Sequence, residues 1–351
     1  VEPESPKQLA GWLSDNLEVE DLKAWPKTGK GQLSTDAETL KQHAHVSLVR
    51  PLLDYRHAAH RVKTWGHTYQ RHLCCDGRIR PGFQLLGART GRMSSQRPNV
   101  QNLPRDPEFR ACFIAPDGHR LVAADYSQIE LRIAGMLSGD NVIIDAYKAS
   151  VDLHTKIVHI FTGKPMAEIT GDERKLGKAI NFGLLYAGGA KTLQSYAQNN
   201  YTLDISLEQA ESYKQQFDQT YKKLRFWQLE KYKQHREQGS FMTAGGRLVT
   251  FRDKNNCFTD SRNYPIQGAA ADLQMLAIAR VHKQLVGAGF HLVNFVHDEL
   301  VLEVAEDKVE DVASQLVLTM SDAFMTLFSR FPTSRDVVQG LVEVGVGQSY
   351  A

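Results

Sequence analysis

The feature of this sequence that most limits the fold is a run of small and apolar residues that ends on an acid, Val122-Ala123-Ala124-Asp125. Such a run predicts a buried strand, and the polar residues at helical spacing that follow it, through Arg132, predict a helix. This change from strand to helix places the Asp125 carboxylate at the tip of a strand. The fold must therefore contain a sheet whose strand end can present this carboxylate.

A second acidic strand end is predicted far downstream. The apolar run from Leu292 to Val296 leads into His297-Asp298-Glu299, and an alternating run from Leu300 to Val304 leads away, as in a β-hairpin. Two acidic strand ends that are distant in sequence can converge on one sheet, where they suit a pair of divalent cations. We therefore hypothesise a two-metal site for phosphoryl transfer.

Composition sets wide limits. The chain has 351 residues, of which 42% are hydrophobic and 23% are charged, values ordinary for a globular protein with two or three subdomains. No apolar run approaches the roughly 20 residues of a membrane-spanning helix, and the first residues do not resemble a secretory signal. A first residue other than methionine suggests a fragment of a longer protein. Four cysteines form neither a zinc spacing nor a disulfide framework, which favours a reducing, intracellular setting: Cys74, Cys75, Cys112 and Cys257.

Positive charge is concentrated in one part of the chain. Between Lys41 and Arg110 there are 13 Lys or Arg residues against 4 Asp or Glu residues. This block fits a surface that faces a phosphate backbone, and a solvated helix face explains it about equally well. Within the block, Leu48 to Arg71 has apolar residues at helical spacing and predicts an amphipathic helix with a basic outer face.

The residues from Asp76 to Pro116 differ from the preceding helical region, because their pattern predicts loops and short strands. The segments Thr90 to Ser95 and Arg97 to Pro104 are rich in Arg, Asn and Gln and contain little apolar surface to bury. One interpretation is a plain surface loop. The other, which the adjacent basic block favours, is a strip that contacts nucleic acid, because these side chains reach both phosphates and base edges.

A helix with a chemically distinctive face is predicted between Thr170 and Gly189. Thr170 followed by Glu173 is a capping box, and the glycine pair at the other end is a stop signal. Two cations and two aromatic residues recur at every fourth position and share one face: Arg174, Lys178, Phe182 and Tyr186. Such a stripe could hold a triphosphate by its charges and a base by its rings, whereas a solvated cationic face leaves the aromatic residues unexplained.

The remaining pattern is largely helical. Helices are expected from Leu131 to Tyr147, from Leu207 to Gln238, from Asn263 onward and from Glu306 to Phe328. Leu341 to Gly347 is expected to be a closing strand.

Five of these segments, in this order, resemble the motifs of family A DNA polymerases, the bacterial DNA polymerase I group. They are Thr90 to Ser95, Asp125 to Arg132, Arg174 to Tyr186, Pro265 to Gly268 and Val296 to Leu300. The resemblance covers nearly all of the chain. It implies an α+β, right-hand polymerase fold with an antiparallel palm sheet, helical fingers and a partial helical thumb. The implied boundaries are 1–75 for the partial thumb and basic helical region, 76–135 and 256–351 for the two parts of the palm, and 136–255 for the fingers.

The resemblance implies template-directed DNA synthesis, in which a deoxynucleotidyl group passes from a dNTP to a primer 3′-hydroxyl in replication or repair. Asp125, Asp298 and the backbone carbonyl of Tyr126 would hold two Mg²⁺ ions, with Mn²⁺ able to substitute. Glu299 would be an auxiliary carboxylate. The implied partners are primer–template DNA and dNTPs, with no membrane, for a monomer in the cytoplasm of a bacterium or of a phage-infected host, or else in an organelle.

Further roles follow from the same resemblance. Arg174 and Lys178 would hold the triphosphate, with Lys178 also a candidate proton donor to the leaving group. Gln128 and His154 would contact the incoming nucleotide, Phe182 would stack on it and favour deoxynucleotides over dideoxynucleotides, and Tyr186 would form the base of the pocket. Glu130, braced by Tyr186, would crowd the sugar 2′ position and exclude ribonucleotides. The implied DNA contacts are Arg92, Asn99, Gln101, Asn263, Gln267 and His297.

The sequence departs from the family pattern at three places, one of which is a short loop before Asn263. Thr259 stands where an arginine is usual, with Arg262 as a candidate substitute, and Ala187 replaces the glycine expected after Tyr186. These departures concern template contacts and fidelity. Two other functions remain open: a polymerase that makes RNA or copies RNA templates, and a DNA-binding replication factor with impaired catalysis. Glu130 argues against ribonucleotide incorporation, and the retained acidic and basic residues argue against lost catalysis.

Overall fold

The computed structural model describes residues 1–104, 106–285 and 289–350. The chain divides into two compact units, a smaller one from Val1 to Gly82 and a larger one that begins at Phe83. Each has its own apolar core. The finer division into thumb, palm and fingers stays a prediction.

The smaller unit is helical. Its core is formed by residues such as Leu13, Leu40 and Val49, which are fully buried. The amphipathic helix expected from Leu48 to Arg71 is present in part, as α4 (Val49–Trp65), but Gly66 interrupts it before the short α5 (His67–Gln70). Only the first part of α4 is buried, since Tyr55 and Val62 are exposed. The helices of this unit are α1 (Pro6–Asn16), α2 (Val19–Ala24), α3 (Ala37–Gln42), α4 (Val49–Trp65) and α5 (His67–Gln70).

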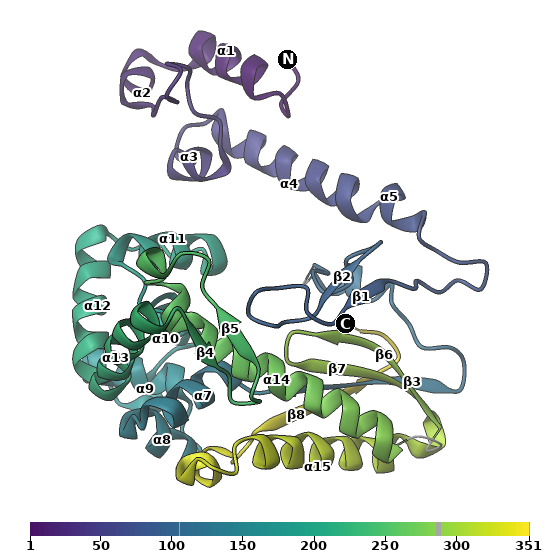
Figure 1. Ribbon diagram of the computed structural model, residues 1–351. Coiled ribbons are helices and arrows are strands. Elements are labelled where there is room, and N and C mark those ends of the chain that lie inside the picture. Colours follow the sequence, from purple (N-terminus) through teal and green to yellow (C-terminus); the bar gives the residue numbers. More distant parts are fainter. Residues whose placement is uncertain (105, 286–288, 351) are drawn as a thin grey trace. The chain divides into compact units, whose positions relative to one another are not determined.

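The larger unit is built on a four-stranded antiparallel sheet in the order β6-β7-β3-β8 (Figure 1). The strands are β3 (His119–Tyr126), β6 (Phe290–Val296), β7 (Glu299–Ala305) and β8 (Val342–Gly347). The predicted hairpin, closing strand and first acidic strand are therefore confirmed. Two short two-stranded sheets are also present: β1 (Gly82–Gln84) with β2 (Ser94–Gln96), and β4 (Ser240–Met242) with β5 (Leu248–Thr250), which pair antiparallel.

Two long helices pack on each other beside the sheet. They are α14 (Asp260–Leu285) and α15 (Val309–Leu327), and α15 contacts β3, β7 and β8 (Figure 1). Successive residues of a strand face opposite sides, so Val122, Ala124 and Tyr126 bury one face of β3 while Asp125 belongs to the other. The Tyr126 hydroxyl donates a hydrogen bond to the carbonyl of Met320 on α15 at 2.7 Å. This anchors the strand end that carries Asp125.

The other large group of helices comprises α7 (Ile129–Ser138), α8 (Asn141–Lys148), α9 (Leu153–Thr162), α10 (Gly171–Leu185), α11 (Ala190–Tyr201), α12 (Leu207–Thr220) and α13 (Lys222–Gln238). Two further helices that the sequence predicts as continuous, Leu131 to Tyr147 and Leu207 to Gln238, are each interrupted. The first breaks because Gly139 adopts a φ of 64° and Asp140 caps α8, accepting a hydrogen bond from the Val142 amide. The second breaks at Tyr221, which separates α12 from α13. Short elements complete the chain: α6 (Pro107–Arg110), η1 (Met166–Glu168), η2 (Lys254–Asn256), η3 (Glu306–Lys308) and η4 (Pro332–Val337).

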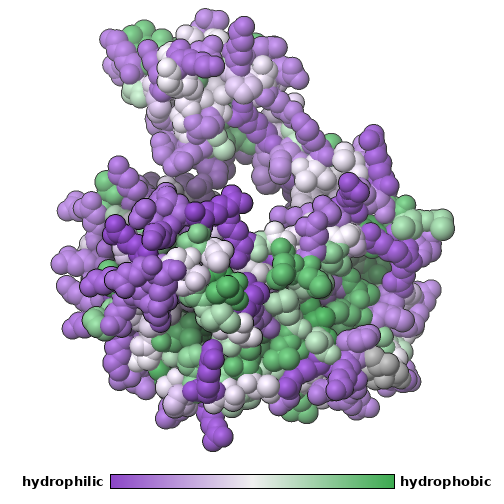
Figure 2. All heavy atoms as spheres, viewed as in Figure 1, coloured by the Kyte–Doolittle hydropathy of each residue, from purple (hydrophilic) through white to green (hydrophobic). Residues whose placement is uncertain are grey.

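Surface character differs between regions of the larger unit. In Figure 2, hydrophilic side chains dominate the face over α11 and α12, whereas apolar side chains gather over and beside α14. Within the described ranges, no helix is both long enough and apolar enough to cross a membrane. All four cysteines are free thiols.

Candidate active site

The acidic strand ends meet at one edge of the sheet, as the sequence predicted. In the β3–β7 register Asp125 lies opposite Glu299, and in the β3–β8 register it lies opposite Glu343. Residues directly opposite each other share a sheet face, so these carboxylates belong to the same face. Glu343 was not singled out from the sequence, because its position beside Asp125 depends on the pairing of β8 with β3.

Asp298 lies in the two-residue turn between β6 and β7. His297 begins this turn in the left-handed region, with a φ of 55°, and the Tyr126 amide donates to the Asp298 carbonyl at 3.3 Å. Burial, and then the negative charge of Glu130, raise the pKa of Asp298 to about 6, although Arg92 opposes the shift. Burial also raises the pKa of Glu299, which accepts a hydrogen bond from the Tyr350 hydroxyl.

The donor groups at this edge suit divalent cations. Carboxylate and carbonyl oxygens are the ligands that Mg²⁺ prefers, and nucleotide sites use one or two carboxylates together with substrate phosphates. A cation would offset the negative charge of Glu130, which adds to the effect of burial in raising the pKa of Asp298. Within the described part of the chain, no three acidic, histidine or cysteine side chains form a metal cluster alone. A site completed by substrate oxygens fits this arrangement.

Four predicted site residues from four different segments form one connected cluster. Arg92 pairs with Glu130, with 2.6 Å between Nη2 and Oε1, and the Tyr186 hydroxyl donates to the other oxygen of Glu130. Gln267 also hydrogen-bonds the side chain of Tyr186. Burial, and then the charge of Glu130, raise the pKa of Tyr186 well above its usual value, so this hydroxyl keeps its proton and acts as a donor.

A buried arginine fastens the turn that follows Asp125, and the sequence did not identify this role. Arg132 is 3% exposed and donates hydrogen bonds to four backbone carbonyls, one of them on Ser127 at 2.7 Å. The other three acceptors lie in the segment that precedes β8: Val337, Gln339 and Gly340. The guanidinium also lies 4.2 Å from the centroid of the Tyr147 ring. Arg132 thus connects the turn after Asp125 to the segment that leads into β8.

The capping box at Thr170 and Glu173 is present and starts α10, as predicted. Arg174 forms two hydrogen bonds with Asp152, at 3.0 and 2.9 Å. Burial raises the pKa of Asp152, but donors from Arg174 and Thr155 outweigh it and hold the pKa at about 2, so the carboxylate stays charged.

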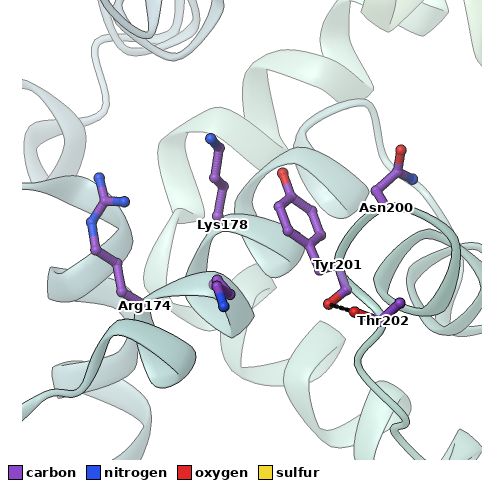
Figure 3. Close-up of a pocket in the computed structure, with 6 residues that line it drawn as sticks. Arg174, Lys178, Asn200, Tyr201 and Thr202 are labelled. Atoms are coloured by element: carbon purple, nitrogen blue, oxygen red, sulfur yellow. Dashed lines mark hydrogen bonds between the residues drawn. The ribbon is translucent and has the colours of Figure 1, made fainter. Parts of the chain in front are cut away.

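A pocket of about 380 Å³ lies beside these cations. In Figure 3, Arg174 and Lys178 of α10 line one side, and Asn200, Tyr201 and Thr202 at the end of α11 line the other. Lys175 also lines the pocket and pairs with Asp172 at 2.8 Å. Arg174 and Lys175 are each paired with a carboxylate, and together with Lys178 they offer hydrogen-bond donors that suit an anionic ligand.

Phe182 lies against a buried polar group. Its ring centroid is 5.4 Å from that of His154, which is 1% exposed. The Asn181 amide lies 3.0 Å from Nδ1 of His154 and accepts a hydrogen bond from the Tyr221 hydroxyl. Burial lowers the pKa of His154 to about 4, so the imidazole is neutral near pH 7. His154 thus supports Phe182 from within the core, and its predicted contact with a nucleotide stays a prediction.

The remaining predicted residues are spread around the sheet and α14. Gln128 accepts from Tyr147 at 3.0 Å, and Gln101 donates to the Phe295 carbonyl at 3.3 Å. Asn99 and His297 are exposed, and Asn263 has a buried Oδ1 with no hydrogen-bond partner in the described part of the chain.

Arg262, the candidate substitute for the arginine missing at Thr259, points inward. It is 4% exposed, and its guanidinium lies 3.6 Å from the centroid of the Phe258 ring. Burial lowers its pKa. Arg262 therefore packs against aromatic residues in this conformation and does not present its charge on the surface.

The sequence was compared with protein-family models and with known proteins, and both comparisons find DNA polymerases. The family model described as DNA polymerase family A matches residues 1–351. The DNA polymerase I of Aquifex aeolicus is 39% identical over 340 residues, which are 96% of this chain and 58% of that protein. The DNA polymerase I of Pseudomonas aeruginosa is 34% identical, over 99% of this chain and 38% of that protein. The chain thus spans less than two thirds of these relatives.

A solved structure is also similar. It is described as the POL domain of Pol1 from M. smegmatis in complex with DNA primer-template and dNTP. It superposes with a TM-score of 0.83 at 31% sequence identity, covering 100% of this chain and 61% of that one. The α+β fold with an antiparallel palm-type sheet is confirmed by this likeness. The chain belongs to DNA polymerase family A.

Proposed function

We propose that this chain carries out template-directed DNA synthesis, adding a deoxynucleotidyl group from a dNTP to a primer 3′-hydroxyl. The observation that carries the proposal is the cluster of Arg92, Glu130, Tyr186 and Gln267, in which the charges of Glu130 and Arg92 act on Asp298. In this proposal Glu130 is the steric gate for the sugar, and Arg92 and Gln267 are the donors for base edges beside Asp298. Membership of the family and the likeness to a complex that holds primer-template and dNTP support the same function.

Asp125, Asp298 and the Tyr126 carbonyl would hold two Mg²⁺ ions, with Glu299 auxiliary. When bound, these ions supply charge neutralisation and activation of the attacking hydroxyl. Arg174 and Lys178 bind the triphosphate in the pocket beside α10, and Lys178 gives a proton from Nζ to the leaving pyrophosphate. Asp152 orients Arg174 through its two hydrogen bonds.

Glu130 selects the sugar in this proposal. Its side chain is held by Arg92 and by Tyr186, so a 2′-hydroxyl could displace it only by breaking both contacts. Phe182 stacks on the incoming base, supported from behind by His154. Gln128 and His154 complete the nucleotide contacts. Arg92 and Gln267 read minor-groove acceptors, and Asn99, Gln101, Asn263 and His297 contact the DNA.

We also propose the arrangement inferred from the sequence for the whole chain. Residues 1–75 form a partial thumb, 76–135 and 256–351 form the palm, and 136–255 form the fingers. The partners are primer–template DNA and dNTPs, and the protein acts as an intracellular monomer in a bacterium, a phage-infected host or an organelle.

Primer extension on a DNA template with Mg²⁺ tests the proposal, with dNTPs and rNTPs compared in parallel. The variants are Asp298→Ala, Glu130→Ala and, as a control, Glu306→Ala, whose exposed side chain pairs with Arg120. We expect Asp298→Ala to abolish extension, Glu130→Ala to gain use of rNTPs, and Glu306→Ala to behave as wild type. Wild-type protein that binds primer–template but adds no nucleotide would contradict the proposal and favour a DNA-binding factor.

A further inference from the structure

The β4–β5 ribbon carries an ion pair between a partly buried arginine and a buried aspartate that no part of the proposed chemistry uses. Nε of Arg247 donates to Oδ1 of Asp272 on α14 at 3.0 Å, and the other oxygen of Asp272 accepts from the Gly245 amide at 3.0 Å. Asp272 is 7% exposed. Both carboxylate oxygens are therefore satisfied, and the ribbon is fixed to α14 by its turn.

The same guanidinium reaches the backbone next to two proposed DNA-reading residues. Nη2 of Arg247 donates to the Thr90 carbonyl at 2.8 Å and approaches the Gly268 carbonyl at 3.4 Å. Thr90 lies two positions before Arg92, and Gly268 directly follows Gln267. One side chain thus ties together two segments that are far apart in sequence and that both supply residues to the cluster around Glu130.

The space around Arg247 leaves little freedom. Gly91 has a φ of 88°, and a Cβ at this position would lie 2.2 Å from Nη2 of Arg247. A Cβ on Gly268 would lie 3.0 Å from Cγ2 of Thr243 and 3.4 Å from the Thr90 carbonyl. Both segments lie in close contact with the guanidinium, so we expect a change at Arg247 to displace their backbones, and with them Arg92 and Gln267.

We propose that Arg247 is a positioning residue that sets the placement of Arg92 and Gln267 around Glu130 and Tyr186, and so controls selection of the sugar and of the primer terminus. The inference rests on the proposed function, and Arg247 does not touch the substrate in it. Arg92 holds Glu130 directly, so its displacement loosens the gate. Gln267 hydrogen-bonds Tyr186, so its displacement weakens the second brace.

The test uses the whole chain with the double substitution Arg247→Met and Asp272→Asn. Removing both charges together avoids leaving a buried carboxylate without a partner. The readouts are the ratio of dNTP to rNTP incorporation efficiency, the ratio of extension from matched to mismatched primer ends, and the thermal midpoint. The matched control is Arg225→Met with Asp218→Asn, a half-buried pair on α13 and α12.

We expect the double variant at Arg247 to lose roughly tenfold in both ratios, the factor that about 1.4 kcal/mol of transition-state discrimination gives, while the control keeps both. A folded double variant with both ratios within about twofold of wild type would overturn the inference and leave DNA synthesis intact. If the double variant does not fold, the single variant Arg247→Lys tests the inference instead. One ammonium group cannot make the hydrogen bonds of the guanidinium to both Asp272 and the Thr90 carbonyl, so both ratios must fall by at least about threefold. Unchanged selectivity in a folded Arg247→Lys protein overturns the inference, and absence of extension by wild type overturns the proposed function itself.

Discussion

Replacing Arg132 by Met is expected to be among the most damaging single substitutions outside the acidic edge. The guanidinium is buried and donates to the carbonyls of Ser127, Val337, Gln339 and Gly340. Methionine fills a similar volume but offers no donor, so it leaves these four carbonyls without that partner. Three of them belong to the segment that leads into β8, which lies beside Asp125 in the sheet.

The magnitude follows from two opposing contributions. A hydrogen bond to a charged group contributes about 1.5–3 kcal/mol, so four of them would give a gross stabilisation of roughly 6–12 kcal/mol. Burial of the guanidinium opposes this, as the lowered pKa of Arg132 indicates. We therefore expect a net loss of about 3–5 kcal/mol in the free energy of unfolding, which corresponds to roughly 10 °C in the thermal midpoint of a unit of this size.

Urea unfolding followed by circular dichroism measures this loss, and primer extension measures its effect on activity. The control is Arg120→Met, because Arg120 is 38% exposed and forms a surface pair with Glu306 at 2.7 Å. That substitution should cost less than about 1 kcal/mol. A loss below about 1.5 kcal/mol in Arg132→Met, with normal extension, would refute the reasoning that these four hydrogen bonds fasten the strand end.

Two further predictions concern stability away from the acidic edge. Ala187→Gly should stabilise the protein by roughly 0.5 kcal/mol in urea unfolding. Ala187 has a φ of 60°, and relief of its left-handed strain, about 1–2 kcal/mol, exceeds the cost of the larger conformational entropy of glycine in the unfolded state. A destabilised variant would contradict this. Burial, and then the charge of Lys231, lower the pKa of His235 to about 4. The contribution of His235 to the free energy of unfolding is therefore fully present above its unfolded pKa near 6.5 and is lost as the pH falls toward 4. His235→Gln should therefore remove about 2 kcal/mol of the stability loss between pH 7 and pH 5, and equal losses in both proteins would show that His235 does not titrate in this way.

The strands and the acidic residues could be predicted because their signals are local. Alternation from Leu300 to Val304 and the apolar run before Asp125 identify strands directly, and the capping box at Thr170 identifies the start of α10. The breaks at Gly139 and Tyr221 were missed for different reasons. Gly139 followed by Asp140 is a recognisable stop and start, whereas Tyr221 continues an apolar helical face, and its backbone geometry depends on tertiary packing.

Contacts within the site were harder to predict than the residues themselves. Arg92, Glu130, Tyr186 and Gln267 were identified through the resemblance, but periodicity gives no indication that they bond to one another. Nothing in the sequence indicates that Arg132 and Arg247 bind several backbone carbonyls, since charged residues are seldom buried. Their roles arise from carbonyls supplied by distant segments. Such partners are visible only once the chain is folded.

The position of β3 between β7 and β8 has a consequence for how the chain is made. During translation the strand that ends at Asp125 emerges long before either neighbour, because Glu299 and Glu343 lie far downstream. Its apolar residues Val122 and Ala124 therefore have no sheet partners until the downstream strands have been synthesised. Sheets built from such non-local pairs also fold slowly, which prolongs this exposure. Premature release before residue 347 would leave β3 as an open sheet edge, and truncated products of this gene should aggregate.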